Sequence, residues 1–82
     1  MVKVVYRDHA VTRMIERHLT PKEVEHVVLF ADGTIPQSKD KVIYYKKMRG
    51  RKDNLIAVVA IKHVEEIEVI TVLVNFEVNH DT

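Results

Sequence analysis

The chain has 82 residues, the length of one small domain, and we expect a single domain over residues 1–82. It contains no cysteine, which excludes disulfides, thiolate metal sites, iron–sulfur clusters and cysteine nucleophiles. Hydrophobic residues make up 46% of the chain but aromatic residues only 6%, so the core must be built mainly from Val, Ile and Leu, which favours strands. No long apolar run follows the basic start, and no stretch is long enough to span a membrane. We therefore expect a cytoplasmic protein without membrane contact.

The net charge of +1 conceals a strong asymmetry along the chain. Residues 1–62 hold all 13 Lys and Arg and seven of the 12 acids, a formal charge of +6. Residues 63–82 hold the other five acids and no Lys or Arg, a formal charge of −5. Such a chain can present a basic face to a partner, or its two parts can pair with each other across the fold. The sequence leaves both possibilities open.

The first third of the chain predicts a short strand and a helix. Residues 2–6 are apolar and β-branched and form a marginal strand. Asp8 is positioned as an N-cap, which predicts a helix over residues 9–18. Four apolar residues recur at three- and four-residue steps and predict its buried stripe: Ala10, Val11, Met14 and Ile15.

A second helix is marked by the clearest local signal in the sequence. Thr20 is placed as its N-cap, Pro21 suits the first helical position, and Glu23 completes a capping box. The helix is expected to reach Ala31 and to end at Asp32-Gly33, with Gly33 in the left-handed cap geometry. Its predicted buried stripe consists of Val24, Val27, Val28 and either Phe30 or Ala31.

The remainder predicts a polar loop and three strands. The loop covers residues 34–41, and the strands cover residues 42–48, 55–62 and 67–78, with a basic turn between the first two. The fold class is therefore α+β, a two-helix hairpin packed on a three- to four-stranded antiparallel sheet. Helices that cover one face leave the face bearing Thr71, Leu73 and Asn75 open, so we expect a two-fold homodimer.

One candidate catalytic group lies on the first helix. His9, Arg13 and Glu16 fall within one narrow helical stripe, with Arg17 beside it. An imidazole can move a proton near neutral pH, and a guanidinium can hold phosphate oxygens, which is the chemistry of phosphodiester cleavage. A solvated helix face with ion pairs between Arg13, Arg17 and Glu16 explains the same pattern.

A second candidate is the basic run that ends the first of these three strands. Five cations lie in seven positions of residues 46–52, directly after two tyrosines. Cations beside aromatic rings are typical of single-stranded RNA contacts. An exposed, charged loop that protects a strand edge is the alternative. The predicted RNA-binding residues are Tyr44, Lys46, Arg49, Arg51 and Lys52.

No cofactor or metal is expected. Glu23 and His26 have the Glu-x-x-His spacing of helical metal sites, but the further carboxylates of such sites are missing. The single Ser38 has no nearby histidine, and there is no glycine-rich phosphate loop.

The helical motifs resemble a family of small bacterial and archaeal proteins, the domain-of-unknown-function family 4258. The resemblance rests on His9-Ala10-x-x-Arg13-Met14-x-Glu16-Arg17, on the following Leu19-Thr20-x-x-Glu23-Val24, on Gly33, and on residues 70–73. It covers nearly the whole chain and marks His9, Arg13, Glu16 and Arg17 as signature residues. His18 stands where the family often has Gly, which predicts slight strain in that turn.

The family in turn resembles the RelE and BrnT ribonuclease toxins of toxin–antitoxin pairs. This resemblance implies a toxin-like fold, metal-independent RNA cleavage and a small antitoxin as protein partner. A non-catalytic RNA- or protein-binding module, and a degenerate toxin fold kept as a dimer, are the alternative interpretations.

Overall fold

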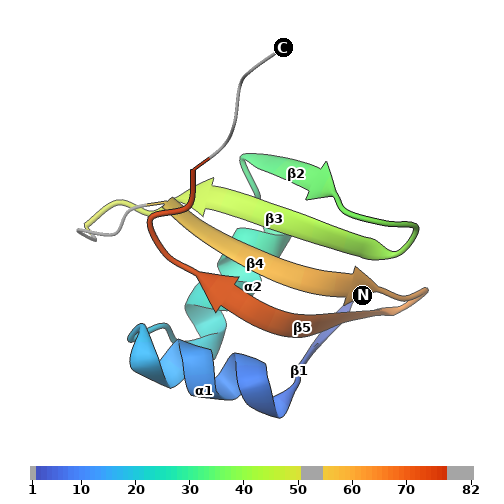
Figure 1. Cartoon of the computed structure of the whole chain (residues 1–82), viewed down its shortest axis with the longest axis horizontal. Helices are drawn as coiled ribbons and strands as arrows, with labels where there is room; N and C mark the ends of the chain where they lie inside the picture. Colours follow the sequence, from blue (N-terminus) through green and yellow to red (C-terminus); the bar gives the residue numbers. More distant parts are fainter. Residues whose placement is uncertain (1, 51–54, 78–82) are drawn as a thin grey trace.

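The computed structural model describes residues 2–50 and 55–77, which form two helices and five strands around one core (Figure 1). In chain order the elements are β1 (Lys3–Tyr6), α1 (Asp8–Glu16), α2 (Pro21–Leu29), β2 (Gly33–Pro36), β3 (Lys41–Lys47), β4 (Leu55–Lys62) and β5 (Glu66–Leu73). The α+β class is confirmed.

The five strands form one mixed sheet in the order β1-β5-β4-β3-β2. β2, β3, β4 and β5 pair antiparallel with their neighbours, whereas β1 pairs parallel with β5, from Lys3 opposite Glu66 to Tyr6 opposite Val69. The expectation of three or four antiparallel strands was therefore wrong. The chain reaches β5 only after both helices and the other strands, and this long connection allows a parallel pair.

Three of the four residues of β2 fall in the segment expected to be a loop, and the position of this strand at the edge of the sheet explains why the sequence did not reveal it. β2 is an edge strand of four residues. Pro36 has no N–H to donate, which an edge strand tolerates because it pairs with a neighbour on one side only. Gly33 is part of this strand and does not cap a helix. A Cβ there would lie 2.1 Å from the hydroxyl oxygen of Tyr45, the residue opposite. Gly33 thus makes room for the Tyr45 ring.

α1 is shorter than the expected helix over residues 9–18. Its N-cap is Arg7, which makes no side-chain cap bond, so the assignment of Asp8 as N-cap was wrong. At the other end the Leu19 N–H donates to the Met14 carbonyl at 2.8 Å, and the His18 N–H donates to Ile15. His18 has φ 57°, so this is a Schellman turn in which a non-glycine residue occupies the left-handed position.

α2 begins as the capping box predicts. The Thr20 hydroxyl accepts from the Glu23 N–H at 3.2 Å, and the Glu23 carboxylate accepts from the Thr20 N–H at 2.9 Å. The helix ends at Leu29 with Phe30 as C-cap, two residues earlier than expected. Phe30 is 61% exposed, so it does not belong to the buried stripe.

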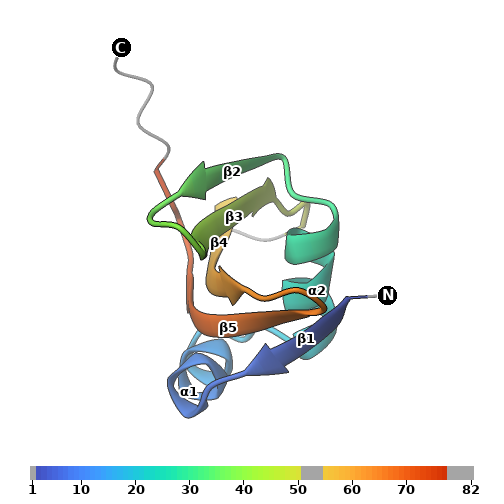
Figure 2. The same cartoon turned by 90° about the vertical axis from the view of Figure 1, so that its right-hand side faces the viewer.

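α2 packs on one face of the sheet, against β3 and β4, whereas α1 packs against β5 and lies beyond the β5 side of the sheet (Figures 1 and 2). Ala10 and Met14 of α1 are buried, but Val11 and Ile15 are exposed, so the predicted stripe was too wide. The Tyr6 hydroxyl donates to the Pro21 carbonyl at 3.2 Å and links β1 to α2. Burial raises the pKa of Tyr6 to about 12, which keeps that hydroxyl a donor.

β5 ends at Leu73, earlier than the strand predicted over residues 67–78, and the last of those residues lies outside the described part. The pairing with β4 shifts between Val59 and Ala60, so Ile70 is an extra residue in the ladder. This bulge exchanges the two faces of β5: Val69 and Val72 both belong to the core. Within the described residues, no helix is long and apolar enough to cross a membrane.

Candidate functional site

The residues of the predicted catalytic stripe lie in one row on the exposed side of α1. His9 is exposed in the first turn, Arg13 follows one turn later and Glu16 ends the helix. The Arg13 guanidinium donates to the Glu16 carboxylate at 2.9 Å. Their side chains are 41% and 51% exposed, so this pair contributes little to stability. The side chains of this row are therefore accessible to solvent and take no part in the packing of the core.

Arg17 lies just beyond this row. It is the C-cap of α1, and its N–H donates to the Arg13 carbonyl at 2.9 Å. Its side chain is exposed. The structure thus places Arg17 at the end of the helix, beside Glu16 rather than beside His9.

The predicted RNA-binding residues separate into different environments. Tyr44 is only 8% exposed and belongs to the core, so its ring cannot stack on a base. Lys46 pairs with Asp32, with 3.5 Å between Nζ and Oδ1, and Arg49 is exposed. Arg51 and Lys52 lie outside the described residues.

A recess brings an imidazole next to the basic end of β3. It has a volume of about 360 Å³ and is lined by His26 of α2 and by Lys46, Lys47, Met48 and Arg49. Sequence reasoning missed this arrangement, because His26 is some twenty residues away from these cations in the chain and only the packing of α2 on β3 brings them together. The recess combines a titratable ring with cations, which suits a phosphate-bearing ligand.

An exposed aromatic ring lies beside this recess. The Phe30 ring packs against His26, with 5.1 Å between the ring centroids. It can offer the stacking surface that was expected of Tyr44. The pattern of buried positions on the predicted helix had assigned Phe30 or Ala31 to the core, which hid this role.

Asp32 fixes the geometry at the edge of the recess. One of its carboxylate oxygens accepts from the Lys47 N–H at 2.9 Å, and its own N–H donates to the Tyr45 carbonyl at 2.8 Å. The Lys47 N–H is the main cause that holds the pKa of Asp32 below its ordinary value, with Lys46 contributing. Asp32 therefore anchors the end of α2 to β3 and orients Lys46.

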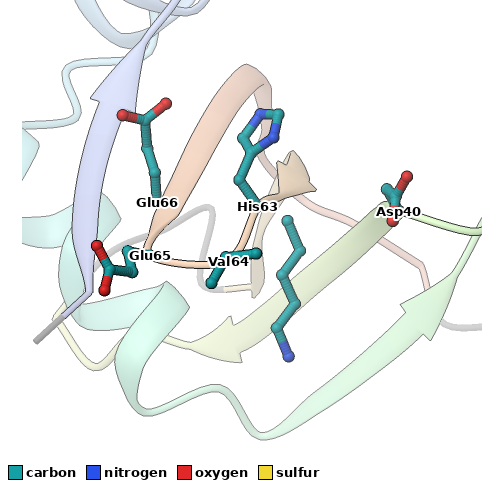
Figure 3. Close-up of a pocket in the computed structure, with 6 residues that line it drawn as sticks. Asp40, His63, Val64, Glu65 and Glu66 are labelled. Carbon is teal, nitrogen blue, oxygen red and sulfur yellow. The ribbon is translucent and has the colours of Figure 1, made fainter.

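A larger pocket lies at the opposite end of the sheet, where β4 turns into β5 (Figure 3). Its volume is about 600 Å³, and Asp40 faces the turn from the end of the β2–β3 connection. Three of its six lining residues are acids, Asp40, Glu65 and Glu66. These carboxylates repel phosphate, so this pocket is a poor site for RNA.

A cluster of charged side chains lies on the sheet near this pocket and joins residues that are distant in the chain. The Glu68 carboxylate forms an ion pair with Arg7 and lies 3.0 Å from Nε2 of His63. Arg7, and to a lesser extent His63, lowers the pKa of Glu68. Nothing in the sequence indicated this cluster, because Arg7 and Glu68 are 61 residues apart.

Within the described ranges 2–50 and 55–77, no group of three or more His, Asp or Glu side chains is arranged to hold a metal ion. Glu23, which has the Glu-x-x-His spacing with His26, takes part in the α2 capping box.

The family described as a domain of unknown function (DUF4258) matches residues 6–74, which include both helices, the α1 row and the recess. No curated protein and no solved structure matches the chain.

Proposed function

The chain belongs to the DUF4258 family, and from that membership and the open row on α1 we propose that it is a toxin-like domain that cleaves RNA without a metal ion. The observation that carries the proposal is the row itself. His9 and the Arg13–Glu16 pair are signature residues by resemblance, yet they are exposed and contribute nothing to the core. Side chains that the packing of the core does not require are candidates for a catalytic role.

The proposed reaction uses the 2′-hydroxyl of the RNA as its nucleophile. The His9 imidazole takes the proton of that hydroxyl while the 2′-oxygen forms a bond to phosphorus. The bond from phosphorus to the 5′-oxygen breaks, and the leaving oxygen takes a proton from water or from an acid. Arg13, oriented by Glu16 at 2.9 Å, holds the phosphate oxygens as their charge increases.

The basic recess supplies the binding surface in this proposal. Lys46, Lys47 and Arg49 attract the phosphate backbone, and the exposed Phe30 ring provides a stacking platform for an unpaired base. Single-stranded RNA is the expected substrate, because its bases can be splayed out onto such a ring. The proposal also includes a small antitoxin protein as partner.

Cleavage of an unstructured RNA oligonucleotide in the presence of a chelator tests this proposal. We expect the wild type to cut, and His9→Ala and Arg13→Ala to lower the rate by about 100-fold or more. Thr12→Ala is the matched control, since Thr12 is an exposed neighbour on α1 whose hydroxyl donates to the Asp8 carbonyl of the same helix. A wild type that does not cut, or a His9→Ala variant that cuts equally well, would overturn the assignment.

A second candidate, a non-catalytic RNA-binding module, is favoured by one specific observation. The imidazole that lines the recess with the cations is that of His26, and His9 is not among the residues that line this recess. RNA binding without cleavage, weakened by His26→Ala and Phe30→Ala but not by His9→Ala, would establish this module.

A further inference from the structure

The cations at the end of β3 line two recesses at once. The recess of about 360 Å³ that contains His26 and a second recess of about 320 Å³ that contains Asp32 are both lined by Lys46, Lys47 and Arg49. An anion held among these three side chains can therefore be reached from the side of the imidazole and from the side of the carboxylate. The three cations thus determine which ligands this end of the sheet can hold.

Two of the three cations have no carboxylate partner. Lys46 forms its ion pair with Asp32, so the charges of these two side chains offset each other. Within the described part of the chain, no carboxylate pairs with the side chains of Lys47 and Arg49, and both residues are exposed. The described residues of the two recesses therefore carry a formal excess of two positive charges.

Two rings of α2 complete the first recess. His26 lies in the last turn of the helix and Phe30 is its C-cap, four residues later, so both rings lie at the same end of the helix. Their planes are tilted by 43°, and the Phe30 ring is 61% exposed. An imidazole donates at least one N–H whether or not it is charged. The recess thus combines an exposed ring at its rim with N–H donors inside.

The volume of the recess limits the size of its ligand. Pockets that bind small molecules have volumes of about 300–1,000 Å³, and the His26 recess lies at the lower end of this range. Proteins that follow a single strand contact about 4–16 nucleotides along a continuous groove. The recess is therefore suited to one nucleotide and not to a longer stretch of a strand.

The excess charge distinguishes between two kinds of phosphate. A phosphodiester within an RNA chain carries one negative charge, whereas a phosphomonoester carries about −1.5 to −2 at pH 7 and offers three acceptor oxygens. Two unpaired cations and an imidazole N–H match the second group in charge and in number of donors. A phosphomonoester is therefore the phosphate that this recess accommodates best.

We propose that the recess binds one nucleotide through a phosphomonoester, with the phosphate between Lys47 and Arg49 and the base on the Phe30 ring. This inference rests on the proposed binding of RNA at the recess and names the part of the RNA that enters it, a phosphorylated end. A free nucleoside monophosphate presents the same chemistry. The row on α1 would then cut the RNA elsewhere, because His9 is not among the residues that line this recess.

Fluorescence anisotropy with matched oligonucleotides tests the phosphate. The probes share one unstructured RNA sequence with an internal label and carry a 5′-phosphate, a 3′-phosphate or hydroxyl groups at both ends. The protein carries His9→Ala so that the RNA stays intact. We expect one phosphorylated probe to bind at least about ten-fold more tightly than the hydroxyl probe, the effect of one further hydrogen bond to a charged group. Competition by adenosine 5′-monophosphate, with adenosine as its control, shows whether a free nucleotide occupies the same recess.

Substitutions in the recess locate the phosphate and the base. Lys47→Ala and Arg49→Ala should each reduce the preference for the phosphorylated end, whereas Phe30→Ala should weaken all probes by the same factor and keep the preference. Lys41→Ala is the matched control, because Lys41 is an exposed lysine at the opposite end of β3 and should change neither. A preference that survives in both cation variants would overturn the proposal.

The same measurements separate this inference from the proposed function. Equal affinity for the three RNA probes would overturn the phosphomonoester assignment and leave RNA binding intact. Binding of adenosine 5′-monophosphate without binding of any RNA would support the phosphomonoester site and overturn RNA as its ligand. Binding of neither would overturn both.

Discussion

Glu68 makes the stability of the fold depend on pH. Its contacts to Arg7 first, and to His63 second, lower its pKa from the ordinary 4.5. A carboxyl group with a lower pKa in the folded chain than in the unfolded chain stabilises the fold above the unfolded pKa. This contribution is lost as the pH falls through the folded pKa. The cluster should therefore matter at neutral pH and cease to matter in acid.

We predict that Glu68→Gln lowers the free energy of unfolding at pH 7, and that the difference from the wild type shrinks as the pH falls below about 4.5. Denaturant titrations at one protein concentration and a series of pH values measure both. Glu65→Gln, which changes an exposed carboxylate in the adjacent turn, is the control. If the difference in the free energy of unfolding stays constant down to pH 2, the charge of Glu68 does not contribute to stability.

His18 occupies a backbone conformation that favours glycine. Its φ of 57° is required by the Schellman turn, and a side chain in this region costs about 1 kcal/mol or more. We predict that His18→Gly raises the free energy of unfolding by up to about 1 kcal/mol, measured by urea titration. Arg17→Gly is the matched comparison, because Arg17 has φ −97° and gains nothing from glycine. Equal losses in both variants would show that the His18 side-chain contacts outweigh the strain.

At the scale of the elements, the α2 capping box offers the most direct test. Thr20→Ala removes the hydroxyl that accepts from the Glu23 N–H, and we predict a loss of about 0.5–2 kcal/mol in the free energy of unfolding. Thr12→Ala, in the middle of α1, should cost less, because its hydroxyl bonds a carbonyl within the helix. Activity per folded molecule should not change. A stability equal to that of the wild type would show that the cap bond contributes nothing.

The sequence predicted those elements whose signals are local. The box of Thr20 and Glu23 depends on residues three apart, and the interior of β4 is apolar on both faces, so both were predicted correctly. β2 and the parallel pairing of β1 were missed, because each depends on a partner strand that is distant in the chain. The bulge at Ile70 left no trace in the alternation of β5, but beyond it Val72 belongs to the core and Leu73 is 40% exposed, in agreement with the predicted open face that bears Leu73.

The residues of the candidate site were likewise predictable only where they are close together in the sequence. The row of His9, Arg13 and Glu16 follows from helical periodicity alone, because all three residues belong to one helix. The recess could not be predicted, since His26 meets Arg49 only through the packing of α2 on β3. Burial of Tyr44 was also hidden, because either of two adjacent tyrosines on a strand can face the core.

At the scale of the whole molecule, the charge asymmetry of the sequence becomes a polarity of the sheet. Acids gather at the turn between β4 and β5, where Glu65 and Glu66 lie, and cations gather at the end of β3. The Arg7–Glu68 pair joins the basic and acidic parts of the chain, whereas Lys46 pairs with Asp32 within the basic part. Both interpretations of the charge pattern thus hold, each in a different region.

This polarity leads to a prediction for RNA binding at the recess. Each cation that neutralises a phosphate releases counterions, so the logarithm of the affinity for single strands falls with the logarithm of salt concentration, with a slope of about −0.7 per contact.

We predict that Arg49→Ala weakens RNA binding and makes this slope shallower by about 0.7. Lys3→Ala, which removes the same charge from β1 at the far edge of the sheet, should leave the slope unchanged. Fluorescence anisotropy of a labelled oligonucleotide between 50 and 200 mM salt, roughly the range over which phosphate contacts dominate, measures both slopes. A site localised at the end of β3 would involve Arg49 but not Lys3. Equal changes in affinity and slope for the two variants would therefore mean that RNA binding depends on net charge alone.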